Sequence, residues 1–446
     1  MCNDGLMSML VAFGVAHRNT LLHQEIPTDV VESLMSRALR DLLALLDNSS
    51  TSTSDLTLTL VMLLSSFMVF TFKSDKWRVH LKGARQILLL RGYSKPFSKL
   101  ITDFRNDDTP ADTYMNNEIK KSRLLFFLIR WFAYIDIFTN LSGPLEPTDD
   151  EVNRYLQKRI RLQLEGNSGS PTMTESTLDS SAFDELDGSQ RGQQQPQQQF
   201  EDSLQPSPDQ LSPQIPVQQT GDQQIDYNIA ADATFMKEES HKDIDYILGF
   251  NIKFLPLYSQ ICKLIKHINI QKRIQAQDQG NSRFEFKVSP KVIERSLQIE
   301  MQFRKLGKIE FDTDYTTNSK SFNSIVASNR CFLLMGLIQL YRRVLQIPRK
   351  SKLVQEMSAS IAGLTQDFID TKKSPSSLCL ILPIFVGGCE CDDPKDRQIY
   401  RANMKDMASQ GSPSAAVASE IMEQCWVTGR DWYEIMYTEN RTVVFL

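Results

Sequence analysis

Three carboxylates near the C-terminus have the spacing of a magnesium–diphosphate site. Asp392, Asp393 and Asp396 follow the pattern DDxxD. In that chemistry the carboxylates lie on one face of a helix, where they hold metal ions that bridge to a diphosphate group. The pattern is typical of helical enzymes that act on isoprenoid diphosphates.

The surrounding sequence disfavours such a site. Pro394 lies inside the motif and disrupts a helix there unless it occupies the first turn. The other acidic pair, Asp107-Asp108, has Ala111 where the third carboxylate belongs, and Asp112 comes one place late. The second metal motif of these enzymes, built from Asn, Ser and Glu, is absent from the sequence. We therefore interpret 392–396 as a solvated acidic turn.

The histidines and cysteines form no metal-binding pattern. None of the five histidines belongs to an HExxH pair, and Cys389-x-Cys391 has no further ligand nearby in the sequence, whereas structural zinc needs four closely organised ligands. The sequence has no GxSxG, P-loop or GxGxxG motif. The seven cysteines, an odd number, lie mostly in apolar runs, which favours buried reduced thiols over disulfides. We expect no catalytic, metal-binding or cofactor-binding residue and no enzyme activity.

The composition is that of a globular, mildly acidic protein. Of the 446 residues, 41% are hydrophobic and 23% are charged, and the formal net charge is −4. A single core usually stops growing beyond roughly 250–300 residues, so we expect two packed lobes or one lobe with a long insertion. Free-standing DNA-binding domains are usually basic, so the charge argues against direct contact with nucleic acid.

Helical periodicity dominates the chain and predicts an all-α fold. In 30–46, apolar residues recur at positions i, i+4 and i+8. The apolar stripe Trp77, Leu81, Ala84 and Leu88 predicts another helix, with Arg91 in its last turn and Gly92 where a left-handed C-cap belongs. Further helical patterns cover 124–141, the chain from 244 through 258, and the tail around Trp426, Trp432 and Tyr433. A strong pattern also covers 322–345, with Arg342 and Arg343 in its final turns. We find no convincing pair of strands.

Three other apolar runs need separate interpretation. Residues 6–16 follow Asp4 rather than a basic segment, so we expect the first core helix instead of a signal peptide. Residues 56–72 carry no charge but fall short of the roughly 20 apolar residues that span a bilayer, so we expect a buried helix. Residues 378–388 end in Gly387-Gly388. We expect no membrane segment.

Two charged residues interrupt the apolar stretch 124–141. Arg130 and Asp136 are six positions apart, so on a helix they point to different faces and cannot pair with each other. Buried charges need partners. We therefore expect each to meet a polar or charged group from another helix and to have a structural role.

A segment of unusual composition divides the chain. Between Gln190 and Gln224 there are 14 Gln and five Pro, with one basic residue. Such a segment has too little apolar surface to offset the entropy of ordering. We therefore predict a disordered insertion at 165–241, between helical parts 1–164 and 242–446 of one domain. It is either inert or a Gln-rich activation segment.

Several strings together resemble the fungal-specific transcription factor domain of zinc-cluster (Zn2Cys6) regulators. They begin at Trp77, Leu124, Ile247, Leu340 and Leu382 and occur in the family's order over most of the chain. The nearest subgroup resembles regulators of lysine synthesis and of GABA use. The matching motif residues are Trp77, His80, Gly83, Arg91, Gly92, Arg130, Asp136, Gly143, Gly388, Cys389 and Arg397.

The resemblance implies an all-α regulatory domain in the nucleus that controls RNA polymerase II genes. It also implies homo- or heterodimers and contact with a coactivator or the transcription machinery. Family members normally carry a six-cysteine cluster that binds two zinc ions near the N-terminus, but only Cys2 lies in the first 250 residues here. We therefore expect zinc and DNA contact only through a module that this chain lacks.

Two alternatives remain open at this point. One is a stand-alone helical co-regulator that acts through heterodimerisation without DNA contact. The remote one is an isoprenoid-diphosphate enzyme that uses Asp392, Asp393 and Asp396.

Overall fold

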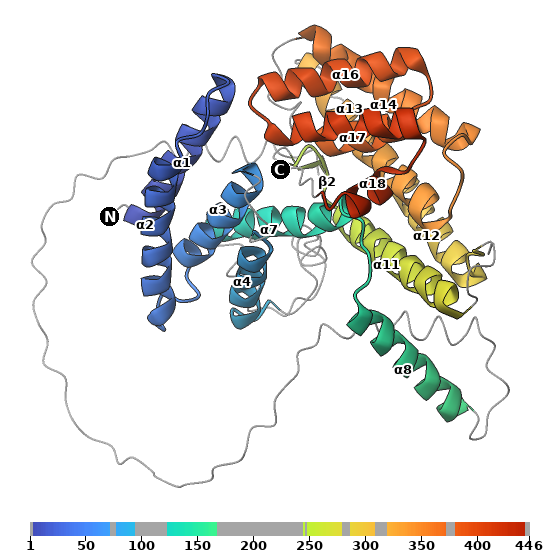
Figure 1. Cartoon of the computed structure of the whole chain (residues 1–446), viewed down its shortest axis with the longest axis horizontal. Helices are drawn as coiled ribbons and strands as arrows, with labels where there is room; N and C mark the ends of the chain where they lie inside the picture. Colours follow the sequence, from blue (N-terminus) through green and yellow to red (C-terminus); the bar gives the residue numbers. More distant parts are fainter. Residues whose placement is uncertain are drawn as a thin grey trace, which may run out of the picture.

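The structure, a computed structural model, describes residues 3–71, 77–93, 123–166, 244–245, 248–278, 286–307, 319–371 and 380–441. These residues form fourteen α-helices, one π-helix and one short hairpin, which confirms the all-α fold class (Figure 1). The predicted insertion at 165–241 lies outside the described residues, except that Glu165 and Gly166 end a helix. Asp107-Asp108 also lie outside them.

Four helices form the N-terminal group: α1 (Asp4–Leu21), α2 (Thr28–Asp47), α3 (Asp55–Thr71) and α4 (Trp77–Leu90). α1 pairs with α2, and α3 packs against α1, α2 and α4. The predicted helices at 6–16, 30–46 and 56–72 correspond to α1, α2 and α3. Gly92 adopts a φ of +87° after α4, which confirms the left-handed C-cap.

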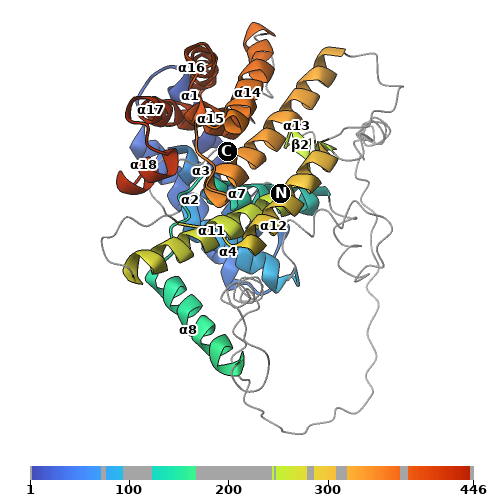
Figure 2. The same ribbon diagram turned by 90° about the vertical axis from the view of Figure 1, so that its right-hand side faces the viewer.

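Helix α7 (Arg123–Leu141) runs across the middle of the molecule and contacts both halves of the chain. It packs against α3 and α4 and also against α11 (Phe254–Asp278) (Figure 1). The next helix, α8 (Asp149–Gly166), extends away from the others (Figure 2). Its residues Val152 and Tyr155 pack on α11.

The chain just before α11 forms a hairpin, so the prediction of a helix from 244 and of no strand pair was wrong. β1 (Ile244–Asp245) pairs antiparallel with β2 (Phe250–Asn251). Gly249 has a φ of +74° and allows the tight reversal that ends in β2. Pro256 lies in the first turn of α11, where the missing N–H has no helical partner to lose.

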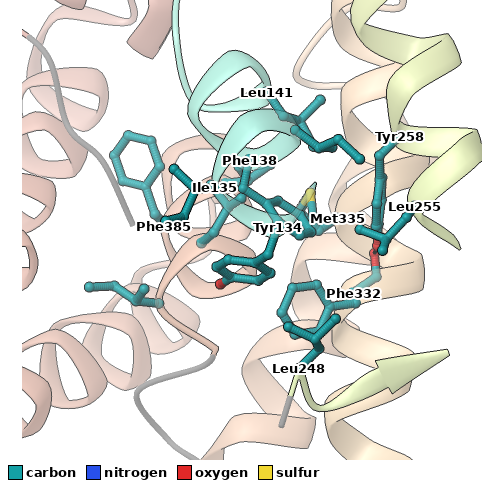
Figure 3. Packing of buried hydrophobic residues seen from close by; sticks show 14 of the residues in the cluster. Tyr134, Ile135, Phe138, Leu141, Leu248, Leu255, Tyr258, Phe332, Met335 and Phe385 are labelled. Atoms are coloured by element: carbon teal, nitrogen blue, oxygen red, sulfur yellow. Dashed lines mark hydrogen bonds between the residues drawn. The ribbon is translucent and has the colours of Figure 1, made fainter. Parts of the chain in front are cut away.

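An aromatic core joins α7, α11, α12 (Pro290–Leu306) and α13 (Ser319–Gln339). The ring centre of Phe138 lies 5.2 Å from that of Tyr258 and 5.8 Å from that of Phe332 (Figure 3). The Tyr258 hydroxyl donates a 2.8 Å hydrogen bond to the Phe332 carbonyl, so the polar end of this buried ring is satisfied. Buried apolar residues from all the described helices except α8 contribute to one contiguous cluster.

Five helices complete the chain: α14 (Lys352–Thr371), α15 (Ile381–Glu390), α16 (Pro394–Ser409), α17 (Pro413–Thr428) and α18 (Trp432–Thr438). The glycines at the end of the apolar run, Gly387-Gly388, lie inside α15, which continues to Glu390. Tyr400 and Met422 pack so close to these glycines that a Cβ atom would not fit.

Two helices in the described ranges are long and apolar enough to cross a membrane by length and composition alone. They cover Leu124–Leu141 and Ser324–Val344, and 56% and 72% of them are buried inside the protein. Both line the aromatic core, as the central helices of a globular fold do.

Candidate functional site

The predicted family-motif residues gather in two places. Seven lie where α4 meets α3 and α7: Trp77, His80, Gly83, Arg91, Gly92, Arg130 and Asp136. Four lie where the end of α7 and the C-terminal helices meet the end of α13: Gly143, Gly388, Cys389 and Arg397.

The first place contains an ion pair between helices. Both carboxylate oxygens of Asp136 lie 2.7 Å from one terminal nitrogen of Arg85 on α4, and both side chains are about three-quarters buried. This confirms that Asp136 meets a charged group from another helix. Arg85 was not predicted as a partner from the sequence. The available indication was that a positively charged residue directly follows Ala84 of the apolar stripe.

Arg130 and Arg91 have different surroundings. The guanidinium carbon of Arg130 lies 4.3 Å from the ring centre of Phe126, one turn earlier on the same helix. A partner for Arg130 from another helix stays a prediction. Arg91 forms a 2.7 Å ion pair with Asp55 at the start of α3, so it joins the end of α4 to its neighbour.

The remaining motif residues of α4 fix its contact with α3. The Ser65 hydroxyl donates a 3.1 Å hydrogen bond to the carbonyl of Trp77, whose side chain is buried. Gly83 faces Val61 at ordinary contact distance. Burial lowers the pKa of His80, which favours its neutral form at pH 7. These contacts are of the kind that hold two packed helices together.

The second place is built around a π-helix, Leu340–Val344, that continues α13. A π-turn holds one residue more than an α-turn and is frequent at functional sites. Arg342 and Arg343 lie in it, and both are more than nine-tenths buried. Their place in the final turns of a helical pattern was predicted from the sequence, but their burial was not.

Arg342 joins two carboxylates from separate helices. Its Nε donates a 2.7 Å hydrogen bond to Glu390 at the end of α15, and a terminal nitrogen pairs with Asp431, the N-cap residue of α18. Burial raises the pKa of Glu390 to about 7, although Arg342 opposes the shift. Both acids were missed by the sequence analysis, and the available signal was Glu390 directly after a long apolar run.

Arg343 reaches back to the end of α7. Its guanidinium donates hydrogen bonds to the carbonyl oxygens of Leu141, Gly143 and Pro144, at 3.1, 2.9 and 2.7 Å. Leu141 is the last residue of α7, and Gly143 and Pro144 follow it closely in the chain, so the guanidinium lies at the negative end of the helix dipole. The rings of Trp432 and Tyr433 cover the same guanidinium at 5.0 and 4.9 Å. Burial lowers the pKa of Arg343 to about 10, so it stays charged at pH 7.

A second set of arginines surrounds the loop after α15. Arg349 and Arg397 donate to the carbonyl of Cys391 at 3.1 and 3.0 Å, and both lie within 3.6 Å of Asp392. The guanidinium of Arg397 also lies 5.2 Å from the ring centre of Trp426. The indole N–H of Trp426 donates a 2.7 Å hydrogen bond to Gly388.

The DDxxD carboxylates therefore have structural partners. Asp392 faces the two arginines outside the helix, and Asp393 caps the start of α16 through the N–H of Lys395. Pro394 occupies the first turn and Asp396 follows it. Because the motif spans a helix start, its carboxylates are not stacked on one helical face as the diphosphate chemistry requires.

The described thiols have the properties of buried core residues. Burial raises the pKa of both Cys389 and Cys391, to about 11 for Cys391, which suppresses the reactive thiolate. Within the described ranges, no group of three or more His, Cys, Asp or Glu side chains could hold a metal ion. Cys2 and Cys379 lie outside those ranges.

The arrangement joins distant segments of the chain. Arg343 connects the π-helix to the end of α7, and Arg342 connects it to α15 and α18. Charged groups of this kind fix the relative position of helices and can shift when a ligand or partner displaces one of them. The arginine cluster, defined as Arg342, Arg343 and their partners, is our candidate site.

One family profile matches the sequence, and it bears the description "Fungal specific transcription factor domain" over residues 1–446. No curated protein and no solved structure matched the chain. Because the match covers the whole sequence, the chain belongs to the family of fungal-specific transcription factor domains.

Proposed function

We propose that this chain is the regulatory domain of a nuclear RNA polymerase II transcription factor of the zinc-cluster class. It responds to an effector or a coactivator and acts as a homo- or heterodimer. Contact with DNA and zinc belongs to a six-cysteine module outside these residues. The family match over 1–446 carries the proposal.

The buried arginine cluster supports a regulatory role. Arg342 binds carboxylates of α15 and α18, and Arg343 binds carbonyl oxygens at the end of α7. Burying such charged groups costs free energy, and removing one partner of a buried pair costs more. A ligand that moved one of these helices would disturb the contacts of Arg342 or Arg343. It would therefore change how stably the other helices pack.

A reporter assay tests the proposal. The chain is fused to an unrelated DNA-binding domain and compared with that domain alone on its own operator. We expect a clear change in transcription, and a second fusion that lacks 167–241 separates an activation segment from an inert insertion. Reporter output equal to that of the DNA-binding domain alone, from a soluble nuclear fusion, would contradict the proposal.

A further inference from the structure

Helix α1 has apolar side chains on two opposite faces. The sequence between Asp4 and Arg18 contains no Asp, Glu, Lys or Arg. The inner face, with Met9, Ala12 and Ala16, is fully buried in the core. A helix that is apolar all round is normally buried all round. The opposite, outer face of α1 is nevertheless exposed. In Figure 1, α1 and α2 lie together on the left of the molecule.

Six of the exposed positions follow the spacing of a helix–helix seam, and Leu10 and His17 are exposed beside them. The six are Asp4, Met7, Val11, Gly14, Arg18 and Leu21. Alternate steps of three and four residues place such positions on one stripe that faces a partner helix. Met7 and Val11 are 42% and 48% exposed, and Leu10 beside them is 49% exposed. The length and pattern fit a second helix.

Gly14 lies in the middle of this stripe without a role in the fold of one chain. A Cβ atom there would meet nothing within 4 Å, so packing does not require glycine. Glycine weakens a helix interior relative to alanine. Because glycine has no side chain, a second helix could approach α1 closely at Gly14. The space that the missing side chain leaves beside Val11 is called the hollow.

We propose that the outer face of α1 binds the same face of a second copy of this chain, with the two helices antiparallel. A two-fold axis between Val11 and Gly14 places each Val11 in the hollow of the partner subunit's Gly14. The interface therefore contains two identical contacts between Val11 and Gly14, as a two-fold symmetric (isologous) dimer requires. This proposal rests on the proposed function, in which the chain forms a homodimer, and it identifies the surface through which that homodimer forms.

Charge complementarity favours this occupant and this direction. Asp4 and Arg18 lie at opposite ends of the exposed stripe. In the antiparallel pair each Asp4 lies within about one turn of the partner subunit's Arg18, and both pairs form together. A parallel pair would place like charges beside each other. The uncharged centre of the stripe disfavours a highly charged partner.

The oligomeric state of the full chain tests the proposal. Sedimentation velocity over a range of concentrations should show a reversible dimer. Gly14→Glu should weaken it at least about tenfold, because a charged side chain then fills the hollow. Glutamate is a better helix former than glycine, so circular dichroism should show no loss of helix. Gly363→Glu is the matched control, since Gly363 also lies within a helix and its Cβ would meet open space.

Charge exchange tests the direction. Asp4→Lys and Arg18→Glu should each weaken the dimer, and an equal mixture of the two variants should restore it, because both opposite-charge pairs then form between unlike chains. A mixture no tighter than either variant alone would overturn the antiparallel pairing. A monomeric wild-type chain, or an unchanged dimer in Gly14→Glu, would overturn the proposed surface. A monomer that still drives the reporter would leave the proposed function standing.

Discussion

The guanidinium of Arg343 donates a hydrogen bond to the carbonyl oxygen of Gly143, which lies 2.9 Å away and 200 residues earlier in the chain. Gly143 follows the end of α7, and Arg343 lies in the π-helix after α13. The contact therefore joins the segments on either side of 167–243.

Replacing Arg343 should destabilise the whole fold. Arg343→Leu leaves the buried carbonyls of Leu141, Gly143 and Pro144 without their donor, and we expect a loss of about 2–4 kcal/mol in the free energy of unfolding. Urea unfolding followed by circular dichroism measures it. Lys352→Leu is the control, because its ion pair with Glu356 is exposed and such pairs contribute about 0–1 kcal/mol. Equal losses in both variants would contradict the assignment.

Glu390 should make stability depend on pH. Burial raises the pKa of Glu390 from 4.5 to about 7, so the folded chain holds this proton more tightly than the unfolded chain. The resulting stabilisation is fully present below about pH 4.5 and is lost as pH rises through about 7. Between pH 5 and 8, wild type should lose on the order of 1–3 kcal/mol relative to Glu390→Gln. Parallel pH profiles of the two proteins would contradict this.

The ion pair of Asp136 and Arg85 should have a structural role. Asp136→Asn removes the charge that faces Arg85 between α7 and α4, and because the pair is partly exposed we expect a loss of about 1–2 kcal/mol. A double-mutant cycle with Arg85→Gln should show that the two losses are not additive. If Asp136→Asn abolished reporter activity with unchanged stability, the structural interpretation would be wrong.

Limited proteolysis should cut the chain first within 165–241, because the Gln- and Pro-rich composition there predicts disorder. The two fragments should stay associated, since α7 and α8 pack on α11 and one apolar cluster includes residues from both sides. Gel filtration of the cut protein measures this. Fragments that elute separately would indicate two independent domains.

The chain as given should not bind DNA sequence-specifically. Its net charge is −4, and its conspicuous basic pair, Arg342-Arg343, is buried. Any residual binding should be weak and steeply sensitive to salt. A mobility-shift experiment at physiological salt compares random duplexes with duplexes that contain CGG. A preference for one sequence would reveal a DNA-reading surface on these helices.

Helical periodicity was sufficient to predict most of the fold. The stripes at 30–46 and 77–88, and the glycine cap at Gly92, depend on local spacing, and the structure has them where the sequence indicated. The hairpin at 244–251 was missed because its two-residue strands are too short for any alternation to be visible. The position of Gly387-Gly388 inside a helix was not predicted, because local spacing does not show that a close tertiary contact requires glycine.

The candidate site was predicted only in outline. Arg342 and Arg343 were recognised as a basic pair at a helix end, but the two carboxylate partners of Arg342 come from 48 and 89 residues later in the chain. Pairings over such separations are set by the packing of whole helices and leave no periodic signal. Single charged residues beside long apolar runs, such as Glu390, are the nearest available indication.

The π-helix also determines which changes of length this chain can tolerate. Deleting one residue between Leu340 and Val344 would leave too few residues for the π-turn and rotate the residues after the deletion by roughly 100° about the helix axis. Arg342 and Arg343 could then no longer both point at their buried partners. Natural relatives should therefore differ in the side chains of this short stretch but keep its length. Surface loops, in contrast, commonly differ in length.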